Sequence, residues 1–467
     1  MSFGSFHLPS VNELLESPPL AGLVRSVSQN RMVTAVRRVL DELRHEAQSA
    51  ASNRRVPTIQ EIAERIARRV VLEQVPSARG VINASGRLWG EGIGPPPLAD
   101  DAIGEVLASS RDYAALATVP EKVELAPYSA AVESLLCEVS GAEAALVAAS
   151  HAGALLLALA ALGEKREVVV SRGQLFEVED GCRLDTLAAA AGARLREVGA
   201  VDKTLAADYE AVLSEGTTAL FWMSSDGGGC GGSRGSLAAA ELIEVGRRYN
   251  VPVLVAAGRC AWTDLNALGC PSGIVVPELV QAGAAMVVAR GDGFFGGPTC
   301  GLVVGQRQWL EPLHRHPLAT PLAAGRLTEA ALLATLRHYR RPEQLRDVLP
   351  PLQVMAVDEQ NLRQRAARLA PQVASCAAVA QTEVLALPAT FPAGHRRQPS
   401  WGIAVHPEGQ SAQGLADALR RAQPPLIVEM EGERLIVDLR TVFPRQDMDL
   451  VEAFVSISPR EPPPVEG

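Results

Sequence analysis

The sequence AALVAASHAGALLLALAALGEKREVVVS, residues 144–171, contains two short apolar runs on either side of a helical stretch. The runs are Ala144–Ala149 and Glu167–Ser171, and the helical stretch is His151–Leu162. A short run that is apolar at nearly every position is typical of a strand buried on both faces. The order of strand, helix and strand therefore predicts a βαβ unit with parallel strands.

The same alternation continues as far as residue 306. Further apolar runs lie at Arg194–Val198, Thr218–Met223, Val251–Ala256, Ala285–Ala289 and Gly301–Val304. Helical stretches such as Leu237–Tyr249 separate them. With the first two runs, they predict an α/β fold with a mostly parallel seven-stranded sheet that has helices on both faces. Ligands of such folds bind at the carboxyl ends of the strands.

The flanking regions have different patterns. Thr58-Ile-Gln-Glu61 is a capping-box pattern that opens a helix running to about Gln74. Beyond Leu327, helical stretches are followed by short strands, a pattern that predicts an α+β domain. We therefore expect a helical head (1–78), a large α/β domain (79–327), a small C-terminal α+β domain (328–460) and a tail (461–467).

The composition is that of a globular protein. Of 467 residues, 47% are hydrophobic and 21% charged, and the formal net charge is −9. No stretch reaches the roughly 18 uninterrupted apolar residues of a membrane span, and Met1–Ser10 has no basic region ahead of an apolar run. The seven cysteines form no C-x-x-C pair and no metal-ligand spacing. These features predict a cytoplasmic protein with reduced thiols and no membrane partner.

The head is mildly basic and the rest of the chain is acidic. Residues 1–79 contain 11 arginines and 8 carboxylates, which gives +3, so the remainder carries −9 − 3 = −12. A basic region of this kind is compatible with binding to nucleic acid. The candidates for phosphate contacts are five arginines of the first helical stretch: Arg25, Arg31, Arg37, Arg38 and Arg44.

Several short motifs occur in an order that points to one family. They are Leu8-Pro-Ser-Val11, Val81-Ile-Asn-Ala-Ser-Gly86, Val170-Ser-Arg-Gly173, Gly296-Gly-Pro298 and Ile436-Val-Asp-Leu-Arg-Thr-Val442. Over almost its whole length the chain resembles the selenocysteine synthases, the L-seryl-tRNA(Sec) selenium transferases. The resemblance implies the aminotransferase-like fold (fold type I) of enzymes that depend on pyridoxal phosphate (PLP). It also implies a tRNA-binding head and a homo-oligomer, either a dimer or a ring of dimers.

The chain departs from the family where the cofactor would be held. The family's cofactor lysine follows Gly-Asp and precedes Gly-Gly-Pro by two apolar residues, and Gly293 occupies that position here. Ala256 likewise replaces the aspartate that stabilises the protonated pyridine nitrogen. The only lysines, Lys122, Lys165 and Lys203, lie in polar or irregular stretches. Because a Schiff base needs an amine, we predict that covalent PLP is absent.

What remains of the family site is a degenerate set of candidate cofactor contacts. By resemblance these are Ser150, His151, Arg183, Asp292 and Gly293. No catalytic residue and no metal ligand is assigned.

Three functions remain open. In the first, the chain is a catalytically inactive homologue that keeps the fold, the oligomer and the binding of RNA or a partner. In the second, it is an active transferase that converts seryl-tRNA(Sec) to selenocysteinyl-tRNA(Sec) with atypical cofactor anchoring. The third is different chemistry at the pocket thiols Cys230, Cys260 and Cys300. The first interpretation is favoured, because both lost residues serve the same cofactor.

Overall fold

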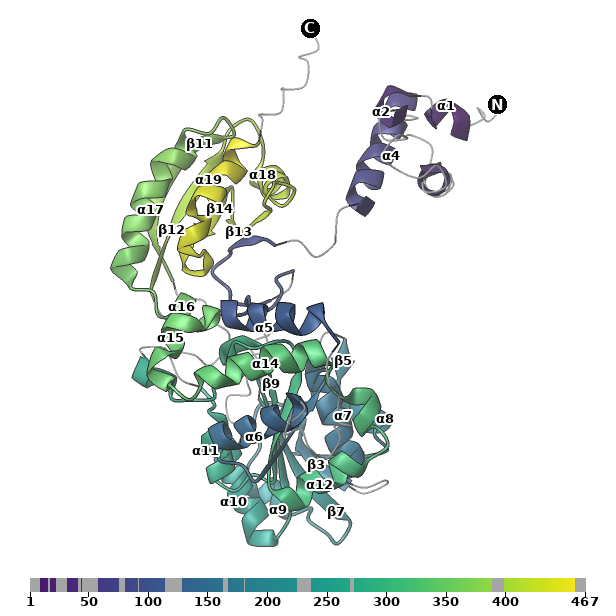
Figure 1. Cartoon of the computed structure of the whole chain (residues 1–467), viewed down its shortest axis with the longest axis vertical. Helices are drawn as coiled ribbons and strands as arrows, with labels where there is room; N and C mark the ends of the chain where they lie inside the picture. Colours follow the sequence, from purple (N-terminus) through teal and green to yellow (C-terminus); the bar gives the residue numbers. More distant parts are fainter. Residues whose placement is uncertain are drawn as a thin grey trace. The chain divides into compact units, whose positions relative to one another are not determined.

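The chain forms two compact units, Met1–Gly80 and Val81–Gly467 (Figure 1). The computed structural model describes residues 9–15, 17–21, 32–40, 43, 58–74, 80–90, 92–113, 128–162, 167–179, 181–224, 237–268, 273–388 and 399–457. Within these ranges, no helix is long and apolar enough to cross a bilayer.

The described part of the first unit is helical. Its helices are α1 (Val11–Leu15), α2 (Pro18–Ala21), residues 32–40 and α4 (Ile59–Gln74). The predicted capping box is present, because the Thr58 N–H donates to Glu61 Oε2 at 2.6 Å and the Glu61 N–H donates to Thr58 Oγ1 at 3.2 Å. The helices bury one shared apolar core, which includes Leu14, Leu20, Val36, Ile62 and Ile66.

The second unit is built on the predicted seven-stranded sheet. Its strand order is β2-β10-β9-β8-β7-β3-β6, and only β10 runs antiparallel to its two neighbours. The bounds are β2 (Ala144–Ala148), β3 (Glu167–Ser171), β6 (Arg194–Val198), β7 (Thr217–Met223), β8 (Val253–Gly258), β9 (Met286–Arg290) and β10 (Gly301–Gly305). The predicted α/β class and mostly parallel sheet are therefore confirmed.

Helices cover both faces of this sheet (Figure 1). One face packs against α6 (Tyr128–Ser140), α10 (Ala239–Tyr249), α11 (Val276–Gln281) and α14 (Arg326–His338). The other packs against α7 (His151–Ala161), α8 (Leu184–Ala190) and α12 (Arg307–Arg315). Neighbouring strand residues such as Val287 and Val288 enter opposite cores. Both faces are buried over the inner strands β8, β9 and β10, so these are continuous apolar runs, whereas the edge strand β6 contains charged residues.

Other elements surround this framework. They are α5 (Asp100–Arg111), which packs on α14, the hairpin strands β4 (Glu177–Glu179) and β5 (Cys182–Arg183), α9 (Ala206–Glu210), α13 (Ala319–Leu322), α15 (Leu345–Val348) and α16 (Pro350–Met355). The β4–β5 hairpin was not predicted. It matters because it brings a carboxylate to the candidate site.

A second sheet has the order β1-β13-β14-β12-β11. Its strands are β1 (Ile82–Ala84), β11 (Val379–Leu387), β12 (Ser400–Pro407), β13 (Leu426–Glu431) and β14 (Arg434–Asp438). The helices α17 (Glu359–Ala374), α18 (Ala412–Leu419) and α19 (Asp447–Val455) pack against it. Because β1 pairs in parallel with β13, the chain immediately after the head contributes to the C-terminal sheet.

Candidate functional site

A cluster of charged side chains lies at the carboxyl ends of β8 and β9. Arg259 directly follows β8, Arg290 is the last residue of β9, and Asp292 precedes the short 3-10 helix η4 (Gly293–Phe295). Glu179 reaches the same cluster from β4. This is the edge of an open α/β sheet at which ligands bind.

Arg290 and Asp292 form a buried, doubly hydrogen-bonded ion pair. Arg290 Nε donates to Asp292 Oδ1 at 2.7 Å and Nη2 donates to Oδ2 at 2.9 Å. The two residues are 7% and 1% exposed. Burial acts to raise the pKa of the Asp292 carboxyl, but the hydrogen bonds and charge of Arg290 and the charge of Arg259 outweigh it and lower that pKa. Asp292 is therefore ionised at neutral pH.

Gly293 lies against the side chain of Arg259. Its φ is +83°, and a Cβ placed on it would lie 2.7 Å from Arg259 Cβ and 2.9 Å from Cγ. The Arg259 guanidinium lies over the Trp89 ring, 5.3 Å from the centroid, and its Nε is 3.5 Å from Asp292 Oδ1. Arg259 thus takes up the space in which a side chain at position 293 would begin.

The first turn of α7 is capped by groups of this chain. Ser150 Oγ accepts a hydrogen bond from the Gly153 N–H at 3.0 Å, which makes Ser150 the N-cap. The Ala152 N–H donates to Glu179 Oε2 at 3.1 Å. The other oxygen of the same carboxylate, Oε1, accepts from Arg290 Nη1 at 2.8 Å. Glu179 therefore joins the α7 N-terminus to the Arg290–Asp292 pair.

His151, the first residue of α7, is 3% exposed. Burial, together with the nearby charge of Arg290, lowers the pKa of its imidazole to about 3. The ring is therefore neutral at physiological pH and adds no charge to the cluster.

The structure brings together four of the five predicted cofactor contacts. Ser150, His151, Asp292 and Gly293 lie around the α7 N-terminus and the end of β9. Arg183 is exposed instead and makes two hydrogen bonds to Asp185, at 3.1 and 2.8 Å. Whether any of the five contacts a cofactor stays a prediction.

Three residues of the cluster were missed by the sequence analysis, namely Arg259, Arg290 and Glu179. The first two stand at the ends of apolar strands, which is a recognisable signal for a functional edge. Glu179 gave no such signal, because it contacts Arg290 across 111 positions of sequence.

The candidate thiols and the lysine that the structure describes are poorly placed for chemistry at this cluster. Cys260 and Cys300 are 5% and 1% exposed, and burial raises the pKa of the Cys300 thiol. A buried protonated thiol is a weak nucleophile. Lys203 is exposed after β6. Cys230, Lys122 and Lys165 lie outside the described residues.

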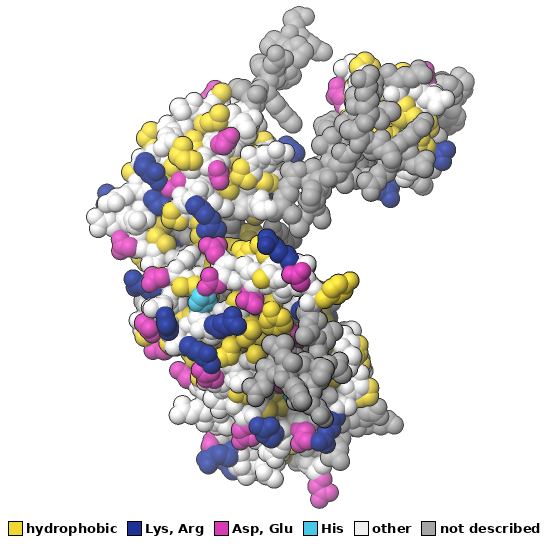
Figure 2. All heavy atoms as spheres, viewed as in Figure 1, with side chains coloured by type: hydrophobic (Ala, Val, Ile, Leu, Met, Phe, Trp, Pro, Cys, Tyr) yellow, Lys and Arg dark blue, Asp and Glu magenta, His cyan; other side chains and the backbone are white. Residues whose placement is uncertain are grey.

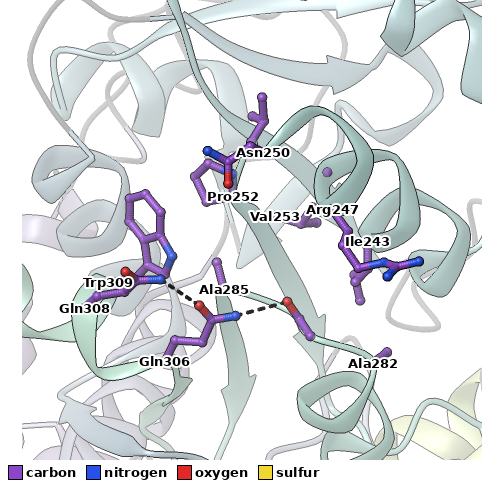
Figure 3. Close-up of a pocket in the computed structure, with 13 residues that line it drawn as sticks. Ile243, Arg247, Asn250, Pro252, Val253, Ala282, Ala285, Gln306, Gln308 and Trp309 are labelled. Atoms are coloured by element: carbon purple, nitrogen blue, oxygen red, sulfur yellow. Dashed lines mark hydrogen bonds between the residues drawn. The ribbon is translucent and has the colours of Figure 1, made fainter.

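A hollow of about 200 Å³ lies at the opposite edge of the sheet (Figure 3). It is lined by residues that precede β8 and β9, such as Pro252 and Ala285, and by Gln306, whose amide donates to the Gly283 carbonyl at 3.3 Å. Its one charged lining residue, Arg247, pairs with Glu244 at 2.8 Å. This hollow has neither the charged groups nor the strand ends of the cluster, so the cluster is the candidate site.

Two of the five predicted RNA-contacting arginines lie in the described part of the head. Arg37 and Arg38 are exposed on the helix of residues 32–40, which buries Val36 and Val39 beside them. Arg25, Arg31 and Arg44 are outside the described residues. On the face of the second unit drawn in Figure 2, basic and acidic side chains are interspersed. The second unit contains exposed ion pairs such as Arg340–Glu138.

The seven-stranded sheet with one reversed strand and a second smaller sheet define the class: fold type I of the PLP-dependent enzymes. A solved structure titled D-glucosaminate-6-phosphate ammonia-lyase matches with a TM-score of 0.59 and 18% identity, covering 82% of this chain and 96% of that one. The chain belongs to the L-seryl-tRNA selenium transferase family, whose model matches residues 81–443. A model of the selenocysteine synthase N terminus matches residues 7–44.

Curated relatives agree over nearly the whole chain. The L-seryl-tRNA(Sec) selenium transferase of Moorella thermoacetica is 34% identical over 454 residues, 96% of each chain. That of Geobacter sulfurreducens is 32% identical over 451 residues, 93% of this chain and 95% of the relative. The family resemblance inferred from the motifs is therefore confirmed.

Proposed function

We propose that this chain is a family member that forms no Schiff base with PLP and does not transfer selenium by PLP chemistry. In this proposal it keeps the fold and the homo-oligomer and acts by binding RNA or a partner. The observation that carries the proposal is the packing of Arg259 against Gly293, because it means that an amine is not merely missing at that position. The space for its side chain is taken as well.

The chemistry of the cofactor explains why this position decides the function. PLP-dependent transfer needs an amine that holds the aldehyde as a Schiff base and then moves protons. Gly293 has no side chain, and its φ of +83° is a conformation that lysine rarely adopts. The residues at this edge therefore do not fit a covalently held PLP.

The end of β8 supports the same conclusion. By family resemblance, an aspartate at position 256 would stabilise the protonated ring nitrogen and make the ring an electron sink. Ala256 is buried to 1% exposure and offers only a methyl group. Both the amine and the carboxylate that the cofactor chemistry needs are thus absent from these two positions.

RNA is the partner that we propose for the head. The curated relatives are named as acting on seryl-tRNA(Sec), and the head is basic while the rest of the chain is acidic. Binding through Arg37, Arg38 and the other three arginines would weaken steeply as salt rises, because each neutralised phosphate releases counterions. We place this binding in the cytoplasm.

The test is to express the full chain with PLP, reduce it with borohydride and search its peptides by mass spectrometry for the reduced cofactor. The expected result is a colourless protein with no modified lysine. The relative from Moorella thermoacetica, treated identically, is the positive control. A cofactor mass on Lys122, Lys165 or Lys203 would overturn the proposal and restore the active transferase. That alternative is favoured by the similarity to the Moorella thermoacetica enzyme over nearly the whole chain.

A further inference from the structure

The carboxylate of Glu179 joins two groups that attract anions. Its Oε2 accepts from the Ala152 N–H at the start of α7, at 3.1 Å, and its Oε1 accepts from Arg290 Nη1, at 2.8 Å. The side chain is 20% exposed and that of Arg290 is 8% exposed. Glu179 is thus held inside the site by both oxygens.

Each of these groups would otherwise attract an external anion. The free N–H groups at the start of a helix carry partial positive charge and bind phosphate or carboxylate, and α7 is 11 residues long. Its Gly153 N–H is already taken by Ser150, which leaves the Ala152 N–H for Glu179. Arg290 is fully engaged, because its other two nitrogens bind Asp292.

His151 provides a second and independent sign of a ligand site. It is the first residue of the same helix and is 97% buried, and neither ring nitrogen makes a hydrogen bond of normal geometry among the described residues, although a backbone group of Val288 lies close enough to act on the imidazole. Leaving a buried polar atom without a partner costs free energy, and such atoms often mark a place for a missing group. The imidazole interacts electrostatically with Arg290 and Asp292, which places it beside the cluster.

We propose that Glu179 is an internal anion that closes this site to tetrahedral oxyanions such as phosphate. An incoming phosphate has to displace the carboxylate from both Ala152 and Arg290. The inference rests on the proposed function and deepens it. The site lacks an amine at position 293, and in addition it excludes anionic ligands at the α7 N-terminus. Removing the carboxylate should therefore create a phosphate site at the α7 N-terminus.

The experiment compares the full-length wild type with Glu179→Ala in inorganic phosphate and in chloride of equal ionic strength. Thermal unfolding should show a lower Tm for the variant in chloride, because Arg290 and the helix N-terminus lose their anion. Phosphate should raise the variant's Tm by a few degrees in a saturable way, since a ligand that binds only the folded state stabilises it. The wild type should show no shift specific to phosphate.

Glu177→Ala is the matched control, because Glu177 is an exposed glutamate on the same strand, two residues away. It should behave as the wild type in both salts. If Glu179→Ala does not fold, Glu179→Gln keeps an oxygen for the Ala152 N–H but removes the charge, and phosphate binding is then followed by calorimetry.

An equal phosphate response in the wild type and the Glu179 variant would overturn the inference, and so would a response of Glu177→Ala that matches that of Glu179→Ala. The experiment contains no PLP. A phosphate response in the wild type would therefore leave the proposed function standing, whereas a borohydride-trapped lysine would defeat the proposed function without changing the phosphate result.

Discussion

Two buried arginine–aspartate pairs lie at strand ends of the second unit. In each pair, the two residues are two positions apart in sequence. Arg290 ends β9 in the large sheet and Asp292 comes two positions later, while Asp438 ends β14 in the small sheet and Arg440 comes two positions later. All four residues are at most 7% exposed. The two pairs therefore consist of the same residue types and are similarly buried, but they differ in hydrogen-bond geometry.

The difference lies in how the carboxylate is hydrogen-bonded. Arg290 donates twice to Asp292 at 2.7 and 2.9 Å, but the Arg440 guanidinium is 3.5 Å from Asp438. Burial raises the pKa of Asp438, and the charge of Arg440 with the hydrogen bonds from Ser400 and the Arg440 N–H offsets this only in part. The pKa of Asp292 is lowered instead. The carboxylate whose pKa is lowered accepts hydrogen bonds from a charged guanidinium on both oxygens, whereas Asp438 accepts direct hydrogen bonds from neutral groups only.

The largest effect is expected from Asp292→Asn. This variant leaves the buried Arg290 with Glu179 as a remaining carboxylate partner and leaves the neighbouring Arg259 facing a neutral amide. Removing one partner of a buried pair costs up to about 3–5 kcal/mol of unfolding free energy. The measurement is urea unfolding followed by circular dichroism.

Asp185→Asn is the control, because Arg183 and Asp185 form the same doubly bonded pair at the same spacing on the surface. It should cause no measurable loss, since exposed pairs contribute little. An Asp292→Asn variant as stable as this control would show that burial adds nothing to the contribution of a doubly hydrogen-bonded pair.

Gly293→Ala should have the next largest effect. A positive φ costs a residue with a Cβ about 1–2 kcal/mol, and the overlap with Arg259 adds about 1–2 kcal/mol of overpacking. Gly409→Ala is the matched control, since Gly409 has φ +66° with open space around it. Gly409→Ala should lose only the stability that corresponds to the positive φ.

A double-mutant cycle with Arg259→Gly isolates the contact, because glycine lacks both the Cβ and the Cγ that a Cβ at position 293 would overlap. Gly293→Ala should destabilise the protein less in the Arg259→Gly background, and the difference should equal the overpacking contribution. Additive losses would contradict the assignment of Arg259 to the space beside Gly293. They would also remove the main support for the claim that this space is closed to a lysine.

The strands were predictable from sequence because their signal is local. β3 and β6 match the predicted runs residue for residue. In β3, Val168–Val170 are buried on both faces and form an unbroken apolar run, whereas β6 is an edge strand with exposed Arg194 and Glu197. β8 begins two residues later than predicted, at Val253, because Pro252 has no N–H to donate to a ladder. The pairing of β1 with β13 was not predictable in this way, because Ile82 and Leu426 are far apart in sequence.

The site was predictable only where the family pattern could be aligned. Gly293 and Ala256 were identified by comparison with that pattern, and His151 and Asp292 were placed by the same alignment. No local signal indicated that Arg259 fills the space beside Gly293 or that Glu179 caps α7. Both contacts come from tertiary packing, which brings a loop and a hairpin strand to the ends of β8 and β9.

The smallest expected effect is that of Asp438→Asn at neutral pH. An asparagine oxygen at this position can still accept from Ser400 Oγ and the Arg440 N–H, which bind Asp438 Oδ1 at 2.7 and 2.9 Å. The loss should therefore be about 1 kcal/mol or less. A loss as large as that of Asp292→Asn would break the comparison, because it would mean that the 3.5 Å ion pair contributes as much as the bidentate one.

The pH dependence sharpens the comparison, because the two pKa shifts have opposite directions. The pKa of Asp438 is raised in the folded protein. Its protonated carboxyl therefore contributes to the free energy of unfolding below about pH 4, and this contribution is lost as the pH rises through the pKa of the folded protein. The free energy of unfolding of Asp438→Asn, relative to that of the wild type, should therefore rise from pH 4 to 7. The folded pKa of Asp292 is lowered, so its contribution is present above about pH 4 and is lost in acid. The deficit of Asp292→Asn should shrink from pH 5 to 3. Unfolding free energies of the three proteins across these ranges check both signs, and two deficits that move the same way with pH would show that the carboxylates share one protonation behaviour.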